Sequence, residues 1–302
     1  MSPAPTRDTP AGRAYNDLRN LARREGRDPA EYFTLYTLEG FLARLAASEY
    51  AADFVLKGGV LMAAFAHRRP TRDIDLAALG ISNDIADVEN RVRSILGEAR
   101  DDGITFDRGS AAGEVIRDDA DYPGVRVKIA ALHASAQVAL HVDVNFGDPI
   151  WPGPAEAEIP LLLGGTLHIR GYPDHMVLAE KIVTAIDRGE QNSRWRDFVD
   201  IAAITATRRI SYVVLHRAIE EVAHYRQVRI EPLTPLLQRM QGLAQRRWAI
   251  WRGRQHLEAS TPERFSDLLE VCVAFADGVL DGTVQGGRWE PGVGAWIGSA
   301  GG

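Results

Sequence analysis

Cysteine is almost absent from this chain of 302 residues, and long apolar runs are missing altogether. The single cysteine, Cys272, excludes a disulfide framework and a thiolate metal cluster, and its apolar helical surroundings predict a small buried side chain. No apolar run approaches the roughly 20 residues of a membrane span, and the N-terminus lacks the apolar segment of a signal peptide. We therefore expect a soluble, cytoplasmic protein that does not associate with membranes.

Several common catalytic signatures are also missing. The sequence contains neither the Gly-x4-Gly-Lys-Ser/Thr phosphate loop nor the Gly-x-Gly-x-x-Gly dinucleotide fingerprint. The eight histidines include no His-x3-His pair, and no serine lies in a nucleophile elbow. These absences argue against a P-loop enzyme, a dinucleotide-dependent enzyme, a zinc enzyme and a serine hydrolase.

Charge is distributed unevenly along the chain, which is long enough for two lobes with separate cores. Between Arg188 and His256, 13 arginines against 6 acidic residues give a local charge of +7, so the remainder carries −13 within a net charge of −6. A basic C-terminal half can face a polyanion. The alternative is a set of solvated helix faces with salt pairs.

Hydrophobic periodicity predicts helices, then strands, then helices again. After a loose start of about 12 residues, helices are expected over 13–25, from Pro29 (capped by Asp28) to about residue 47, and from a cap at 82–84 to about residue 98. Alternation with a period of two predicts strands between 104 and 146, clearest over 124–132 and 138–146. A connector rich in Pro and Gly is expected over 151–165. Beyond it, helices are expected over 173–188, from 194, and over 211–225, 235–252 and 262–281, followed by a tail that packs back on the body.

The stretch from Phe54 to Leu76 organises the rest of the chain. Residues 54–56 read as a buried strand that Gly58 and Gly59 break, and a short helix over 60–65 can follow with free N–H groups that suit a phosphate. Asp73 and Asp75 flank Ile74, so on a strand both carboxylates point to one face while Ile74 packs inward. Like charges that close are costly without a cation between them, which predicts a divalent metal.

A third acid lies on the later strand over 138–146. Asp143 sits between Val142 and Val144, where a core strand normally has no ionisable group. We interpret it as a further site residue, with a strand-end carboxylate in a salt bridge as the alternative. His141 shares its strand face, and we interpret it as a polar neighbour rather than a ligand. Three acids on two strands suit two-metal phosphoryl or nucleotidyl transfer.

Seven sequence blocks resemble the AbiEii/AbiGii toxin family, which includes the mycobacterial MenT-type toxins and belongs to the polymerase-β-like nucleotidyltransferases. The blocks follow in family order over about residues 15 to 205, whereas the C-terminal third is similar only in being helical and basic. The blocks are 32–48, 54–62, 68–76, 122–127, 143–148, 179–183 and 192–201. One departure is Gly-Gly after the first strand, where relatives often carry Gly-Ser, so backbone N–H groups would contact the phosphate there.

The resemblance implies an α/β (α+β) fold. A nucleotidyltransferase domain with a mixed sheet would cover residues 1–165, and a helical, basic domain would cover 166–302. It also implies roles for individual residues. The metal ligands would be Asp73, Asp75 and Asp143, and the catalytic set would add Lys181 and Asp200. The expected nucleotide-binding residues are Lys57, Gly58, Gly59, Arg72, Arg126, Lys128, Lys181, Arg194 and Asp197. Whether Asp197 or Asp200 is the acid of the fourth motif stays open.

The resemblance further implies a toxin that moves a nucleoside monophosphate from an NTP to the 3′ end of tRNA and so blocks aminoacylation. The cofactor would be Mg²⁺, with Mn²⁺ as the alternative. The partners would be tRNA, with phosphate contacts from residues such as Arg208, Arg209, Arg246 and Arg247, and a cognate antitoxin. A monomer is compatible with the sequence. The alternatives are a protein or small-molecule acceptor, or a non-catalytic protein that binds a nucleotide or partner.

Overall fold

The computed structural model describes residues 5–66, 71–116, 124–282, 284 and 286–298. These residues form two compact units. The described parts of Met1–Ala64, Arg68–Asp148 and Pro154–Tyr172 make up the first, which we call the sheet unit. The described parts of Phe65–His67, Pro149–Gly153 and Pro173–Gly302 make up the second, the helical unit. The motif residues 68–70 and 122–123 lie outside the described residues.

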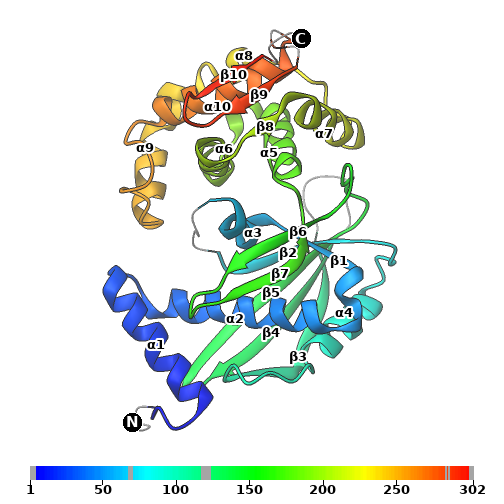
Figure 1. The fold of residues 1–302 in the computed structure, drawn as a ribbon, viewed down its shortest axis with the longest axis vertical. Helices are drawn as coiled ribbons and strands as arrows, with labels where there is room; N and C mark the ends of the chain where they lie inside the picture. Colours follow the sequence, from blue (N-terminus) through cyan, green and yellow to red (C-terminus); the bar gives the residue numbers. More distant parts are fainter. Residues whose placement is uncertain (1–4, 67–70, 117–123, 283, 285, 299–302) are drawn as a thin grey trace. The chain divides into compact units, whose positions relative to one another are not determined.

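A mixed sheet of seven strands in the order β3-β4-β5-β2-β1-β7-β6 forms the body of the sheet unit (Figure 1). β2 pairs with β5, and β1 with β7, in parallel, while the other neighbours are antiparallel. The expected α/β class with a mixed sheet is thus confirmed. The strands are β1 (Phe54–Lys57), β2 (Asp73–Ala78), β3 (Ile104–Ile116), β4 (Gly124–His133), β5 (Ala136–Asn145), β6 (Ala155–Pro160) and β7 (Thr166–Gly171).

Three helices, α1 (Pro10–Glu25), α2 (Pro29–Ala47) and α4 (Ile85–Ile95), pack on the sheet, and α2 runs across its strands in Figure 1. α2 has the predicted bounds, because the Asp28 side chain accepts a hydrogen bond from the Ala30 N–H and Pro29 suits the first turn. α1 begins before the predicted Arg13, since Thr9 caps it and Pro10 opens it. Most of α2 is buried, so it is a central helix rather than one with a single apolar stripe.

The predicted connector over 151–165 is wrong in its middle part. Residues 155–160 form β6, an edge strand paired with β7, and the chain does not become helical until α5 (Asp174–Arg188). The physical signal is alternation: Ala157 and Ile159 are buried while Glu156 and Glu158 are exposed. The Pro and Gly content of the flanks hid this short period of two.

The helical unit contains α5, α6 (Trp195–Thr207), α7 (Tyr212–Tyr225), α8 (Leu233–Leu237), α9 (Met240–Arg254) and α10 (Phe265–Leu280). The single helix predicted over 235–252 is therefore two helices. The tail packs back on the body as expected. Its strands β9 (Arg288–Glu290) and β10 (Ala295–Ile297) form a small sheet with β8 (Ile210–Ser211), and Trp289 and Trp296 contact Phe275 of α10. Cys272 is fully buried, as predicted. Within the described part of the chain, no helix has both the length and the apolar character needed to cross a membrane.

Candidate active site

The parallel pairing of β2 with β5 brings the predicted acids together. In this register Asp73 lies opposite His141, and Asp75 lies opposite Asp143. Because side chains alternate along a strand, these four residues share one face of the sheet. Ile74 and Val142, on the other face, are fully buried. That buried face is also the one on which the ring of His133 packs against Tyr15 of α1 and Phe33 of α2, so the acids lie on the opposite face.

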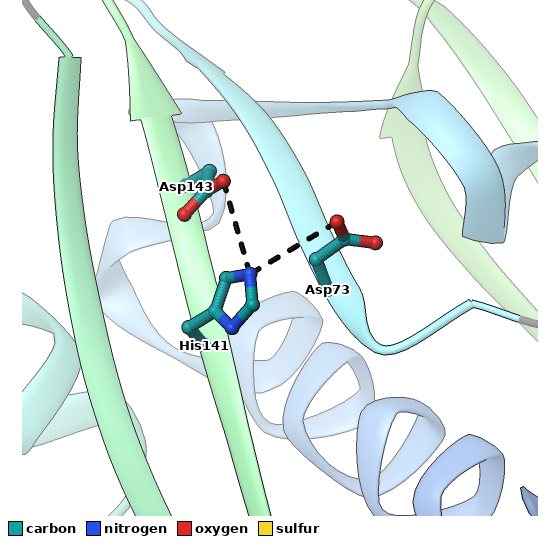
Figure 2. A group of neighbouring side chains, drawn as sticks. All are labelled: Asp73, His141 and Asp143. Atoms are coloured by element: carbon teal, nitrogen blue, oxygen red, sulfur yellow. Dashed lines mark ion pairs between the residues drawn. The ribbon is translucent and has the colours of Figure 1, made fainter. Parts of the chain in front are cut away.

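Asp73, His141 and Asp143 form a compact group of possible metal ligands. One donor atom from each lies within 4.8 Å of the other two. The Nε2 atom of His141 is 3.9 Å from Asp73 Oδ2 and 4.0 Å from Asp143 Oδ2, and Figure 2 shows the imidazole directed at both carboxylates. Sequence reasoning interpreted His141 as a polar neighbour only. The structure adds it to the donor set, and its position two residues before Asp143 was the available signal.

Asp75 is positioned by the glycine turn after β1. Gly58 has φ +69°, and a Cβ at this position would lie 1.8 Å from Asp75 Oδ2. Only glycine therefore allows the chain to begin α3 (Gly58–Phe65) so close to this carboxylate. The first N–H groups of α3 belong to Gly58 and Gly59, the residues predicted to contact phosphate.

Lys57 already has a counter-charge in the sheet unit. Its ammonium forms an ion pair with Asp148, and both side chains are nearly buried. The Nζ atom also lies 5.3 Å from the ring centroid of Tyr172, a cation–π distance. Sequence reasoning did not single out Asp148 or Tyr172 as site residues. A phosphate contact from Lys57 stays a prediction, and so does one from Arg72, which is exposed just before β2.

Asp143 is both a member of the acid cluster and part of a salt bridge, so the two alternatives raised for it coexist. Arg126 of β4 lies directly opposite in the register and donates two hydrogen bonds of 2.7 Å, from Nε to Oδ1 and from Nη2 to Oδ2. The hydrogen bonds to Asp143 raise the pKa of Arg126 above its ordinary value. Lys128, two residues further along the same face, instead pairs with the exposed Glu114 at 2.7 Å.

The donor set fits a divalent cation. Two carboxylates and one imidazole supply oxygen and nitrogen ligands without a thiolate, and Asp75 adds a further carboxylate beside them. Mg²⁺ prefers oxygen ligands, whereas Mn²⁺ accepts an imidazole more readily. The Thr71 hydroxyl donates a hydrogen bond of 2.6 Å to Asp73 Oδ1, which fixes the orientation of that carboxylate, as outer hydrogen bonds do at metal sites.

A second charged cluster lies in the helical unit. The Nζ atom of Lys181 on α5 is 2.9 Å from Asp197 Oδ1 and 2.8 Å from Asp200 Oδ2, both on α6. Asp200 is almost fully buried, whereas Asp197 also lies 3.5 Å from Arg194. Both candidates for the fourth-motif acid therefore contact the predicted lysine, and the geometry does not separate their roles.

The arginines expected to contact RNA fall into two groups. Arg208 pairs with Asp174 at 3.2 Å and Arg209 with Glu290 at 2.9 Å, at the rim of an open hollow of about 670 Å³. Arg246 and Arg247 are exposed on α9, and within the described ranges no acid forms an ion pair with either. The hollow contains none of the clustered acids, so we attach no catalytic role to it.

Comparison with known proteins gives one strong match. Residues 40–271 match the family described as the AbiEii nucleotidyl transferase toxin of a type IV toxin–antitoxin system. No curated protein is similar enough to count as a relative. Two solved structures from Helicobacter pylori are distantly similar. One is described as a candidate nucleotidyltransferase (13% identity, TM-score 0.45, covering 82% of this chain and 95% of that one). The other is JHP933 (14% identity, TM-score 0.43, covering 82% and 91%).

Proposed function

The chain belongs to the AbiEii nucleotidyl transferase toxin family, and from this premise we propose that it transfers a nucleoside monophosphate from an NTP to the 3′ end of tRNA. The observation that carries the catalytic part is the group of Asp73, His141 and Asp143, with Asp75 beside them, on the face of the sheet opposite α1 and α2. A nucleotidyltransferase needs such a concentration of donors, because they hold the divalent cations that surround the triphosphate during the reaction.

The reaction exchanges one phosphorus–oxygen bond for another. An oxygen of the acceptor hydroxyl bonds to the α-phosphorus, and the bond from that phosphorus to the oxygen bridging to the β-phosphate breaks. Pyrophosphate leaves with the electron pair, and the hydroxyl proton passes to a base, for which a carboxylate of the cluster is suited. When bound, the divalent metal supplies positive charge to the phosphates and lowers the pKa of the attacking hydroxyl.

The chain's own residues hold and orient the reactants. Asp73, Asp75 and Asp143 would bind the metal, together with His141. The N–H groups at the start of α3 would receive a phosphate, because Gly58 and Gly59 leave the backbone open to it. In the helical unit, Asp197 and Asp200 hold the Lys181 ammonium in place, and Lys181 would offset charge on the nucleotide.

Labelled NTPs test the transfer itself. The protein is incubated with total RNA, Mg²⁺ or Mn²⁺, and each α-³²P-labelled NTP in turn. We expect label in tRNA with the wild type and none with Asp75→Asn, which keeps the size of the side chain but loses its charge. Absence of label with every NTP and both metals, from protein that is folded by circular dichroism, would refute the proposal.

The acceptor is tested by salt dependence. The charge of +7 between Arg188 and His256, with Arg246 and Arg247 exposed on α9, supports an RNA acceptor. Binding of tRNA should weaken steeply with salt, and each lost arginine–phosphate contact should lower the log–log slope by about one. We expect this lower slope for Arg246→Gln and Arg247→Gln. We do not expect it for the control Arg229→Gln, whose side chain is 89% exposed and pairs with Glu231. Label in a protein or small molecule with little salt dependence would favour those acceptors instead.

The family also implies an antitoxin partner, because its members belong to type IV toxin–antitoxin systems. We propose that the toxin acts in the cytoplasm, where NTPs and tRNA are available.

A further inference from the structure

We propose that Arg126 is a built-in cation that occupies Asp143 until a divalent metal binds, so that metal binding and release of the guanidinium are one coupled event. The inference rests on the proposed function only in taking Asp73, His141 and Asp143 as the metal site. It gives Arg126 a regulatory position at that site, which differs from the simple phosphate contact expected from the sequence.

The geometry places the guanidinium and a metal in competition for the same carboxylate. Arg126 occupies both oxygens of Asp143, each at 2.7 Å. The oxygen that faces His141 at 4.0 Å, Oδ2, is also the one that accepts from Arg126 Nη2. Asp143 is only 8% exposed, so it has little freedom to offer a metal a different oxygen.

Release of Arg126 must occur by movement. A guanidinium does not lose its proton in proteins, so a metal cannot displace it by changing its charge. A divalent cation near Asp143 would repel the guanidinium, since both are cations competing for the same carboxylate. The Arg126 side chain is 33% exposed, which leaves it an outward path that the buried carboxylate lacks.

The neighbouring strand offers a destination. Glu114 of β3 lies opposite Arg126 in the register, on the side away from Asp143, and its exposed carboxylate is already paired with Lys128. A guanidinium that moves toward this edge remains one strand from the metal site. There it can form two hydrogen bonds to a phosphate group, for which its planar fork is suited.

Lys128 provides a matched control. It lies on the same strand and face as Arg126, opposite His141, and carries the same charge, but it forms an ion pair with Glu114. Loss of any nearby positive charge should improve cation binding slightly, and Lys128→Gln measures that general effect. Any larger gain in Arg126→Gln reports the removal of a direct competitor.

The test measures Mn²⁺ binding to the full chain without nucleotide, by the loss of the free-ion signal in electron paramagnetic resonance. We expect Arg126→Gln to bind Mn²⁺ about tenfold more tightly than the wild type, and Lys128→Gln to stay within about threefold. Asp143→Asn should bind at least about tenfold more weakly, because it loses a ligand. In the presence of saturating Mn²⁺, a non-hydrolysable NTP analogue should bind more weakly to Arg126→Gln.

The inference is overturned if Arg126→Gln binds Mn²⁺ no more tightly than Lys128→Gln, or if the wild type binds no Mn²⁺. Its failure is distinct from failure of the proposed function. Transfer of label to RNA by the wild type with unchanged Mn²⁺ affinity in Arg126→Gln would remove only the inference. Tighter Mn²⁺ binding in that variant, with no transfer of label by the wild type, would remove only the proposed function.

Discussion

The sheet unit and the helical unit each hold carboxylates close together, but the counter-charges differ. In the helical unit, Asp197 and Asp200 both contact the ammonium of Lys181. In the sheet unit, Asp73 and Asp143 converge on the imidazole of His141, and Arg126 forms an ion pair with Asp143. The first cluster therefore has a lysine ammonium at its centre, whereas the second centres on an imidazole and contains the carboxylates proposed to bind a metal.

This contrast predicts that removing a carboxylate has different effects on stability in the two clusters. Removing a carboxylate from a buried ion pair leaves a charge unpaired, which destabilises a protein. Removing one from a group of like charges relieves repulsion, so the fold should tolerate the change while a metal-dependent activity is lost. Neutral, nearly isosteric substitutions in the two clusters test this distinction.

The largest effect is expected for Asp73→Asn in the sheet unit. Nucleotidyl transfer should fall about a thousandfold, or about 4 kcal/mol of transition-state stabilisation, because a metal ligand is weakened. The urea midpoint of unfolding should stay the same or rise, since Asn can still accept the hydrogen bond from Thr71. A marked loss of stability would show that Asp73 is a structural residue, like the carboxylates that hold Lys181.

Asp200→Asn in the helical unit should behave in the opposite way. It should lower the free energy of unfolding by about 3 kcal/mol, because Lys181 is only 11% exposed and loses one of its two carboxylates. Urea denaturation measures the loss. The double variant Lys181→Met/Asp200→Leu should recover most of it by removing both charges. A stable single variant would contradict a structural role for this pair.

Binding of a divalent cation at the carboxylates of the sheet unit should stabilise the folded protein. At tenfold excess over its dissociation constant, Mn²⁺ should add about 1.4 kcal/mol to the stability of the wild type, which thermal unfolding detects as a higher midpoint. Asp73→Asn should lose most of this response, and Asp200→Asn should keep it. An equal response in both variants would mean that the metal binds elsewhere.

The smallest effect concerns His133, on the face of the sheet opposite the acids. Its ring is fully buried among Tyr15, Phe33 and Tyr36, and neither ring nitrogen has a hydrogen-bond partner within the described ranges. Burial lowers the pKa of His133 below its ordinary value of 6.5, so below that pH the unfolded chain binds a proton that the folded chain excludes. Stability should therefore fall as the pH drops below about 6.5.

Urea unfolding at pH 7.5 and pH 5 measures this loss of stability on acidification. His133→Phe should reduce the loss on acidification by about 1 kcal/mol relative to the wild type. His168→Gln, which removes an exposed histidine, supplies the control. Equal pH dependence in all three proteins would show that His133 does not titrate differently on folding.

Local patterns predicted much of the sheet unit and its acids. The alternation around Ile74 placed Asp73 and Asp75 on one face, and the break at Gly58 marked the start of α3. The pairing of Arg126 with Asp143 was not predictable, because it depends on the register between β4 and β5. That register follows from the tight turn at Ala134, whose φ of +52° is unusual for a residue with a Cβ.

Strand pairings between distant parts of the chain could not be predicted from the sequence either. β7 joins β1 in parallel, and β8 joins β9, across separations that no local pattern encodes. The same applies to His141, whose spacing from Asp143 was visible but whose partner across the strand, Asp73, was not. In each case, tertiary context decided the outcome rather than local propensity.

The parallel register of β2 and β5 has a consequence for how the sheet assembles. A slip of β5 by one residue would turn His141 and Asp143 into the apolar layer beneath α2 and expose Val142 and Val144 to solvent. Burying an imidazole and a carboxylate there would be far costlier than burying two valines. The polar side chains of the site thus make misaligned pairing of β2 and β5 energetically unfavourable. Replacing them with apolar residues should make this pairing less specific.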